Sequence, residues 1–212
     1  MKMLVSAVAL LVLPVSATWA AALDLSLSND TANLVYVLSD DPLNRQGLPS
    51  GNGGSELGLG VFFNEGSDNL LHATLLARGY RKASSSQYQI SAGMKLLGGE
   101  IGVEDEETSF EQGESVGALA LGFQTGLLLK SANFNPVDIT FEGFCAPSIT
   151  SFADAERYGE VSVRLQVEVM TRARAYIGYR RIRFDTNDFE NISLDRSAHF
   201  GCLLYTSPSP RD

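Results

Sequence analysis

Residues 159–169 read GEVSVRLQVEV, a stretch in which apolar and polar side chains alternate strictly. Valine or leucine occupies every odd position from 161 to 169, and the even positions carry serine, glutamine, arginine or glutamate. Because successive side chains of a β-strand point to opposite faces, this stretch predicts one strand with an apolar face and a polar face. Which face meets water decides between a soluble β-protein and a barrel that spans a membrane.

Similar alternation recurs along the chain after residue 22, and no segment there has the 3.6-residue period of an amphipathic helix. The breaks between alternating segments are rich in the Gly, Pro, Asn, Asp and Ser residues that turns require. Ten strands are predicted, at residues 23–28, 33–39, 55–63, 70–80, 88–97, 116–129, 137–146, 157–169, 174–184 and 192–201. This pattern predicts an all-β fold, an antiparallel up-and-down transmembrane β-barrel of about ten strands.

The expected topology follows from placing the C-terminal end of the barrel in the periplasm. The short turn at 170–173 then lies on the periplasmic side, and the longer segments 98–115 and 147–156 lie outside the cell, as is usual for bacterial barrels. The segment 40–54 becomes a long periplasmic loop, which the same rule disfavours. A barrel of eight strands with an N-terminal appendage is therefore the alternative.

Both ends of the chain are predicted to lie outside the barrel domain, which is assigned to residues 23–201. Residues 1–22 are interpreted as a signal peptide, with Lys2 as a positive start, an apolar run and small residues that suit cleavage. Residues 202–212 break the alternation and can be encoded by a DNA string that looks like a sequencing-library adapter, so we expect non-native read-through there. Cys145 is then the one expected native cysteine, which leaves no intramolecular disulfide.

The polar faces of the predicted strands supply the candidate functional residues. If the valine face points outward, the polar faces line the lumen and carry charges of both signs, which are expected to pair across a narrow barrel into a plug. The residues predicted to line the lumen are Arg78, Lys95, Glu142, Glu160, Arg164, Glu168 and Arg174. Replacing Arg164 and Lys95 by alanine is accordingly predicted to raise single-channel conductance.

Three features favour the membrane over a soluble barrel. Glycine and alanine are frequent within strands, and an export signal is present without an anchoring helix. Aromatic residues near strand ends suit interfacial girdles; these are Phe62, Phe63, Tyr80, Tyr88, Phe134, Phe141, Phe144, Tyr158, Tyr176, Tyr179 and Phe184. The alternative is a soluble periplasmic barrel of the lipocalin type, with its valine faces turned inward around an apolar ligand.

The sequence offers little that indicates chemistry, so no enzymatic activity, cofactor or metal is expected. His72 and His199 have no companions at metal-ligand spacing. Carboxylates at 40–41 and 104–107 could hold calcium or magnesium, but a solvated acidic loop is the simpler interpretation. The net charge of −9 gives no basic field for nucleic acid. The expected partners are outer-membrane lipid, lipopolysaccharide and the barrel-assembly machinery, with a monomer favoured.

Two stretches carry a family resemblance: FEGFCAPSITSFADAERYGEVSVRLQVEV, which begins at Phe141, and ARAYIGYRRIRFD, which begins at Ala173. They resemble the YfaZ family of Gram-negative bacteria, exported proteins regarded as outer-membrane barrels. The likeness covers most of residues 23–201, and Cys145 stands where an aromatic residue would be expected. The resemblance implies a location in the outer membrane after export, and it implies no catalytic or ligand-binding residue.

Overall fold

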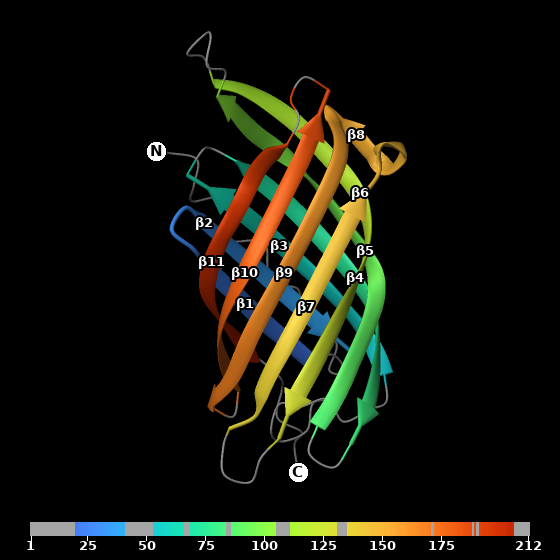
Figure 1. Cartoon of the computed structure of the whole chain (residues 1–212), viewed down its shortest axis with the longest axis vertical. Helices are drawn as coiled ribbons and strands as arrows, with labels where there is room; N and C mark the ends of the chain where they lie inside the picture. Colours follow the sequence, from blue (N-terminus) through green and yellow to red (C-terminus); the bar gives the residue numbers. More distant parts are fainter. Residues whose placement is uncertain are drawn as a thin grey trace.

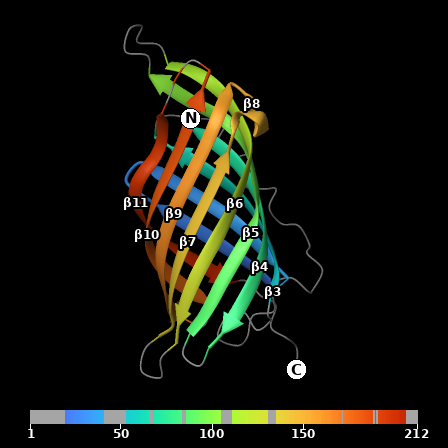
Figure 2. The same cartoon turned by 45° about the vertical axis from the view of Figure 1, so that its right-hand side comes forward.

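A computed structural model of the chain describes residues 20–40, 53–65, 68–83, 86–104, 111–130, 135–170, 172–187, 189 and 191–205. These residues form a closed antiparallel β-barrel of ten strands, which confirms the predicted all-β barrel (Figures 1 and 2). The strands of the ring are β1 (Ala20–Leu27), β2 (Thr31–Ser39), β3 (Gly53–Asn64), β4 (Asn69–Lys82), β5 (Ser86–Glu104), β6 (Glu111–Leu129), β7 (Val137–Ala146), β9 (Ala155–Met170), β10 (Ala173–Thr186) and β11 (Ile192–Tyr205). A single turn of 3-10 helix, η2 (Ser148–Thr150), and a short strand, β8 (Ser151–Ala153), lie between β7 and β9.

The ring closes where the first strand pairs with the last. β1 and β11 run antiparallel with six residue pairs, from Ala22 opposite Tyr205 to Leu27 opposite Phe200. Closure leaves the ring without an open sheet edge. Four of the six pairs use residues 202–205 of β11, which the sequence assigned to read-through, and β1 includes residues 20–22 at the end of the predicted signal peptide.

All ten predicted strands are present, whereas the expected loop at 98–115 is largely wrong. β5 and β6 are each 19 residues long and stay paired as far as Glu104 opposite Glu111. Ile101 and Val116 point inward and pack in a buried apolar cluster, so the hairpin keeps its strand pairing beyond Leu97. The sequence also missed β8, whose three residues pair with β6. Among the described residues, no helix is long and apolar enough to cross a membrane.

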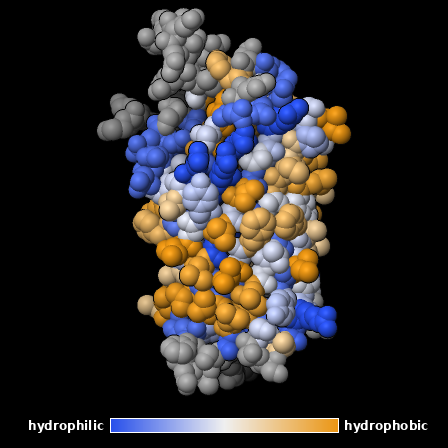
Figure 3. Space-filling model, viewed as in Figure 1, coloured by the Kyte–Doolittle hydropathy of each residue, from blue (hydrophilic) through white to orange (hydrophobic). Residues whose placement is uncertain are grey.

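The apolar faces of the strands point outward and the polar faces point inward. In β9, Val161 is 49% exposed while the neighbouring Glu160 is 6% exposed, and this alternation continues along the strand. β5 follows the same rule, with Ile90, Met94 and Leu96 exposed and Lys95 buried. On the face seen in Figure 3 the result is a band of apolar side chains, with hydrophilic residues above it and at its lower rim.

The expected aromatic girdle is wrong for about half of its members. Phe63, Tyr88, Phe141 and Tyr179 are exposed on the outside of the barrel, as expected. The inward-facing ones are Phe62, Tyr80, Phe144, Tyr158, Tyr176 and Phe184. Their position in the strand alternation places them on the inner face, so most of them serve as interior packing instead. Phe134 lies outside the described residues.

The barrel has two unlike ends, which we name by their elements. The hairpin end carries the far end of the β5–β6 hairpin together with β8, and the terminal end is where β1 begins and β11 ends (Figure 1). An apolar cluster fills the interior toward the hairpin end. At its centre Phe184 is fully buried, and its ring centroid lies 4.9 Å from that of Tyr158.

Candidate functional site

A cavity of about 220 Å³ occupies the barrel interior between the terminal end and the apolar cluster. Its lining comes from all ten strands of the ring. At the terminal end it reaches Ser39, Tyr80 and Tyr205, and toward the hairpin end it stops at Phe62 and Leu97, which belong to the apolar cluster. The cavity is therefore bounded on the hairpin side by packed apolar side chains.

Charged side chains of both signs line this cavity, because the inward positions of the alternating strands are polar. Five basic residues face five acidic residues. The bases are Arg78, Lys95, Arg164, Arg174 and Arg180, and the acids are Asp24, Glu56, Asp138, Glu142 and Glu160. Each base has a carboxylate within 4.0 Å, so the opposite charges offset one another across the lumen.

One buried network centres on Lys95 of β5. Its Nζ lies 2.5 Å from Oε2 of Glu160 and 3.8 Å from Oε1 of Glu142, and it sits 4.5 Å from the ring centroid of Phe144. The hydroxyl of Tyr158 donates a hydrogen bond to the same oxygen of Glu160. A buried ammonium between two carboxylates satisfies the rule that buried charges are paired and hydrogen-bonded.

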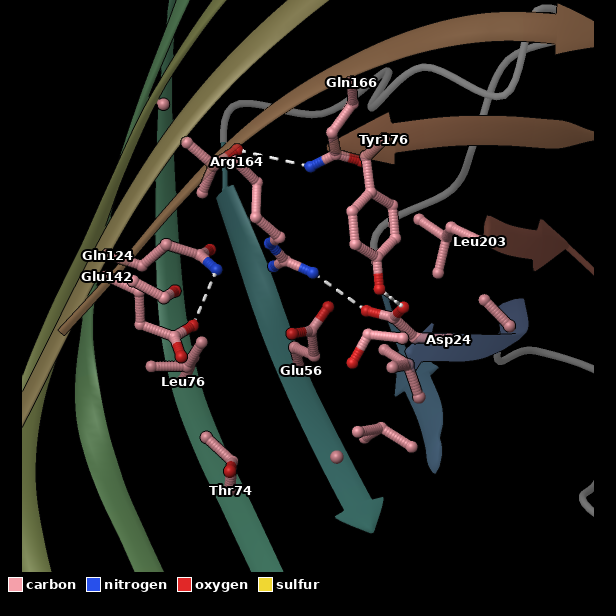
Figure 4. Close-up of a pocket in the computed structure, with 18 of the residues that line it drawn as sticks. Asp24, Glu56, Thr74, Leu76, Gln124, Glu142, Arg164, Gln166, Tyr176 and Leu203 are labelled. Carbon is pink, nitrogen blue, oxygen red and sulfur yellow. Dashed lines mark hydrogen bonds and ion pairs between the residues drawn. The ribbon is translucent and has the colours of Figure 1, made fainter. Parts of the chain in front are cut away.

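A chain of amides extends this network toward the terminal end. Nε2 of Gln124 donates to Oε2 of Glu142 at 3.1 Å (Figure 4). Nε2 of Gln89 in turn donates to Oε1 of Gln124 at 2.6 Å. The side chains come from β5, β6 and β7, three neighbouring strands of the ring. The network therefore joins one wall of the barrel to β9 through Lys95 and Glu160.

A second cluster lies on the opposite wall around Asp24 of β1. Nη1 of Arg164 donates to Oδ2 of Asp24 at 2.8 Å, and the hydroxyl of Tyr176 donates to its other carboxylate oxygen (Figure 4). The guanidinium carbon of Arg164 lies 5.4 Å from the ring centroid of Tyr176. Gly201 permits this arrangement, because a Cβ there would overlap the Tyr176 ring and the carbonyl oxygen of Leu25.

A third cluster joins β10, β11 and β2 near the apolar cluster. Nε of Arg180 donates to Oδ2 of Asp195 at 2.7 Å, and the hydroxyl of Thr31 donates to the same oxygen at 3.3 Å. Ser197 donates to the other oxygen of Asp195 at 2.5 Å. The guanidinium of Arg180 also lies over the ring of Phe62, with its central carbon 5.2 Å from the ring centroid. Both carboxylate oxygens of this fully enclosed acid are therefore satisfied.

Two further pairs lie closer to the terminal end. Arg78 of β4 forms an ion pair with Glu56 of β3. Nη1 of Arg174 lies 4.0 Å from Oδ2 of Asp138, and its guanidinium carbon lies 5.6 Å from the ring centroid of Tyr205. These pairs extend the charged lining to the end of the ring where β11 finishes.

Six of the seven predicted lumen-lining residues lie on the cavity wall: Arg78, Lys95, Glu142, Glu160, Arg164 and Arg174. The structure brings Lys95, Glu142 and Glu160 together and places the others in separate pairs. Glu168 is not part of the lining, and its Oε2 is buried without a hydrogen-bond partner among the described residues.

Sequence reasoning missed Arg180, Asp195 and Asp24 as members of the interior. Arg180 shares its strand and its parity with the predicted Arg174, so the alternation alone was a signal for it. Asp195 and Asp24 gave weaker signals, because a register irregularity interrupts the pairing of β10 with β11 and β1 is short. The role of Asp24 as a counter-charge follows from its contact with Arg164 of β9, which is not a neighbour of β1, whereas Asp195 pairs with Arg180 of the neighbouring β10.

The two histidines and the acidic loop candidates form no metal centre within the described residues. No group of three or more His, Cys, Asp or Glu side chains is placed to hold an ion there. His72 lies inside the barrel with Nε2 3.2 Å from Oδ1 of Asn33, and His199 packs edge-on against Tyr176. Asp40 accepts hydrogen bonds from the backbone and the hydroxyl of Ser55, which lower its pKa. Residue 41, residues 105–107 and the side chain of residue 104 lie outside the described part.

No protein-family model matches the chain, and a comparison with curated proteins finds no match. The arrangement of side chains is consequently the basis for a functional conclusion. The charges that line the cavity are paired, so its lining is close to neutral.

Proposed function

We propose that this chain is an outer-membrane β-barrel of a Gram-negative bacterium, structural and non-enzymatic, with a lumen filled by paired charges. One observation carries the proposal: the strands expose their apolar side chains and bury their charged ones. A soluble barrel is expected to do the reverse. The narrow-pore function is less favoured, because the apolar cluster blocks the lumen toward the hairpin end.

The outer surface is better suited to lipid than to water. Most strands of the ring contribute exposed large apolar residues, among them Leu71, Ile90, Leu121, Val163 and Phe200. Soluble monomers rarely expose contiguous apolar patches of more than a few hundred Å². A closed barrel also pairs its backbone groups within the ring, which is what a spanning structure requires in hydrocarbon.

The two ends suit a fixed orientation in which the hairpin end faces the cell exterior. The extended β5–β6 hairpin and the β7–β9 connection with η2 and β8 lie at that end, whereas β9 and β10 are joined at the terminal end by two residues. Bacterial barrels have long external and short periplasmic connections. The connection at 41–52 departs from this rule, and it lies outside the described residues.

The remaining parts of the proposal rest on the sequence. The signal peptide at 1–22 supplies export, and the resemblance to the YfaZ family supports the outer membrane as the destination. The barrel-assembly machinery and lipopolysaccharide are the partners that such a location implies, and a monomer is favoured.

The experiment that tests the proposal is fractionation of the expressed chain, followed by gel electrophoresis with and without boiling. We expect recovery in the outer membrane and a mobility that changes on heating. Recovery as a soluble periplasmic protein without a heat-dependent shift would contradict the proposal and support the lipocalin-type alternative.

Two matched arginine substitutions sharpen this test. Val163→Arg places a charge in the middle of the outer apolar band, and Ser193→Arg places one at the exposed hairpin rim of β11. In a membrane the first should cost about 2–4 kcal/mol of stability and the second about 0–1 kcal/mol. Equal and small effects of both substitutions on unfolding would mean that water surrounds the band.

A further inference from the structure

Outward-facing arginines cluster at the upper edge of the apolar band. Arg181 and Arg183 of β10 alternate with the inward-facing Ile182 and Phe184, so both guanidinium groups project from the outer surface. Arg157 of β9 is also exposed. In the β-sheet, Asp185 pairs with Arg157 and Gly159 pairs with Arg183, which brings the three arginines onto one patch.

This patch contains a groove on the outside of the barrel. The groove is lined by Arg157, Arg181 and Arg183 together with Cys145, Val161 and Asp185. Gly159 also lines the groove, and the space over it is open, since a Cβ built there would meet no atom within 4 Å. A fourth arginine, Arg196 of β11, is exposed and lies opposite Arg181 in the register.

The groove has an excess of positive charge that the described residues leave unpaired. None of the four guanidinium groups forms an ion pair or a side-chain hydrogen bond within the described part of the chain. Of the two acidic residues in the lining, Glu160 turns its carboxylate inward to Lys95, and Asp185 accepts a hydrogen bond from the backbone N–H of Asn191 at 2.9 Å. Three arginines and one aspartate leave a net positive groove that is open to the outside.

The groove lies at the boundary between the apolar band and the hydrophilic surface above it. Val161 lines the groove and begins the run of exposed apolar residues of β9, which continues through Val163, Leu165 and Val167 toward the terminal end. On β10 the next exposed residue below Arg181 is Tyr179, an aromatic residue of the kind found at membrane interfaces. The hydrophilic surface above the apolar band in Figure 3 lies over these upper parts of the front strands.

We propose that the Arg157–Arg181–Arg183 groove binds the phosphate-bearing head group of an outer-leaflet glycolipid. This inference rests on the proposed outer-membrane function, because it requires the hairpin end to face outward. Guanidinium groups bind phosphate through paired, charge-assisted hydrogen bonds, and the open space over Gly159 leaves room for the head group. The apolar residues directly below the groove would lie against the acyl chains of the same lipid.

The test is native mass spectrometry of the full chain in detergent, titrated with bis-phosphorylated lipid A. Arg181→Gln with Arg183→Gln removes two charges of the groove. Arg81→Gln with Arg172→Gln removes two exposed charges at the terminal end and serves as the matched control. We expect a 1:1 adduct that is at least about tenfold weaker for the groove variant and unchanged for the control.

Two further probes identify the source of the phosphate. Lipid A from which both phosphates have been removed should form no adduct at the same concentration. Inorganic phosphate at millimolar concentration should not displace lipid A, and displacement would mean that the groove is a site for free phosphate. Equal weakening by both double variants, or equal binding of the dephosphorylated lipid, would also overturn the proposal.

The two proposals can fail separately. Each variant is first checked for recovery in the outer membrane and for its heat-dependent gel mobility, which show that it has folded. If the wild-type chain is soluble in the periplasm, the proposed function fails. If the groove variant folds in the outer membrane and binds lipid A as tightly as the wild type does, the lipid site alone fails.

Discussion

The two halves of the barrel interior are filled by different chemistry. Toward the hairpin end, Phe62, Ile101 and Phe184 pack with small and aliphatic residues into a cluster that excludes water. Toward the terminal end, the same strands present ion pairs such as Arg164 with Asp24 around a cavity. One ring of strands therefore holds a dry layer above a polar layer.

The two layers are expected to contribute differently to the stability of the barrel. Burial of large apolar side chains is favourable in itself, whereas a buried ion pair roughly compensates the cost of removing its charges from water. We therefore expect the apolar cluster to contribute more to the free energy of unfolding. The charged layer should mainly set the polarity of the cavity.

The largest effect is expected from Phe184→Ala, which removes the ring at the centre of the apolar cluster. Large-to-small substitutions at such sites cost about 3–5 kcal/mol. The protein loses the transfer free energy of the buried ring, and the cavity left behind adds a further cost. The free energy of unfolding in detergent or lipid, measured by denaturant titration, checks this. Phe200→Ala on the outer surface is the control and should cost less, and a loss for Phe184→Ala below about 1 kcal/mol would show that the cluster is loosely packed.

A somewhat smaller effect is expected from Lys95→Met in the charged layer. The substitution leaves the carboxylates of Glu160 and Glu142 without their ammonium partner, which should cost about 3 kcal/mol. Adding Glu160→Gln should recover part of the loss, because one uncompensated charge is removed. A double-mutant cycle for this pair measures the coupling. Strict additivity of the two single effects would show that the ion pair contributes no net coupling.

Much of the fold could be predicted from the sequence, because the alternation of a strand is a local property. The period of two placed all ten strands, and it also put Lys95, Arg164 and Glu160 on the inner faces. The same parity could have corrected the girdle: Tyr176 and Phe184 share their strand face with Arg174, so a strand with Arg174 inside must also have these rings inside.

The layering of the interior could not be predicted in this way. Arg164 and Asp24 are 140 residues apart, and their contact depends on how the strands are staggered around the closed ring. The position of a side chain along the barrel axis also depends on this stagger. The sequence therefore predicted a lumen of paired charges throughout and missed the apolar cluster above them.

A smaller, pH-dependent effect is expected at Asp68 in the connection between β3 and β4. Its side chain is 4% exposed, and its carboxylate accepts hydrogen bonds from the backbone N–H of Gly102 at 2.7 Å and from Asn64 at 2.9 Å. Burial raises its pKa above the ordinary value of 3.8, against the opposing effect of these hydrogen bonds.

The sign of the pH dependence follows from this direction. The folded state holds the Asp68 proton at pH values where the unfolded state has released it, so stability falls as pH rises from about 4 through the raised pKa. Asp68→Asn should remove this part of the slope. Free energies of unfolding at pH 4 and pH 6, compared between the wild type and the variant, check it; a slope that is unchanged or steeper in the variant would contradict the assignment.

The smallest effect is expected for conductance, where the layered interior changes what the sequence alone predicted. Lys95→Ala and Arg164→Ala enlarge the polar layer, but ions must still pass the packed cluster around Phe62 and Phe184. We therefore expect neither substitution alone to raise single-channel conductance in planar bilayers. Conductance should rise when Phe62→Ala and Phe184→Ala are added to the charge substitutions, because side chains are then removed from both the charged layer and the apolar cluster. A rise with Lys95→Ala alone would mean that the ion pairs, and not the apolar cluster, close the lumen.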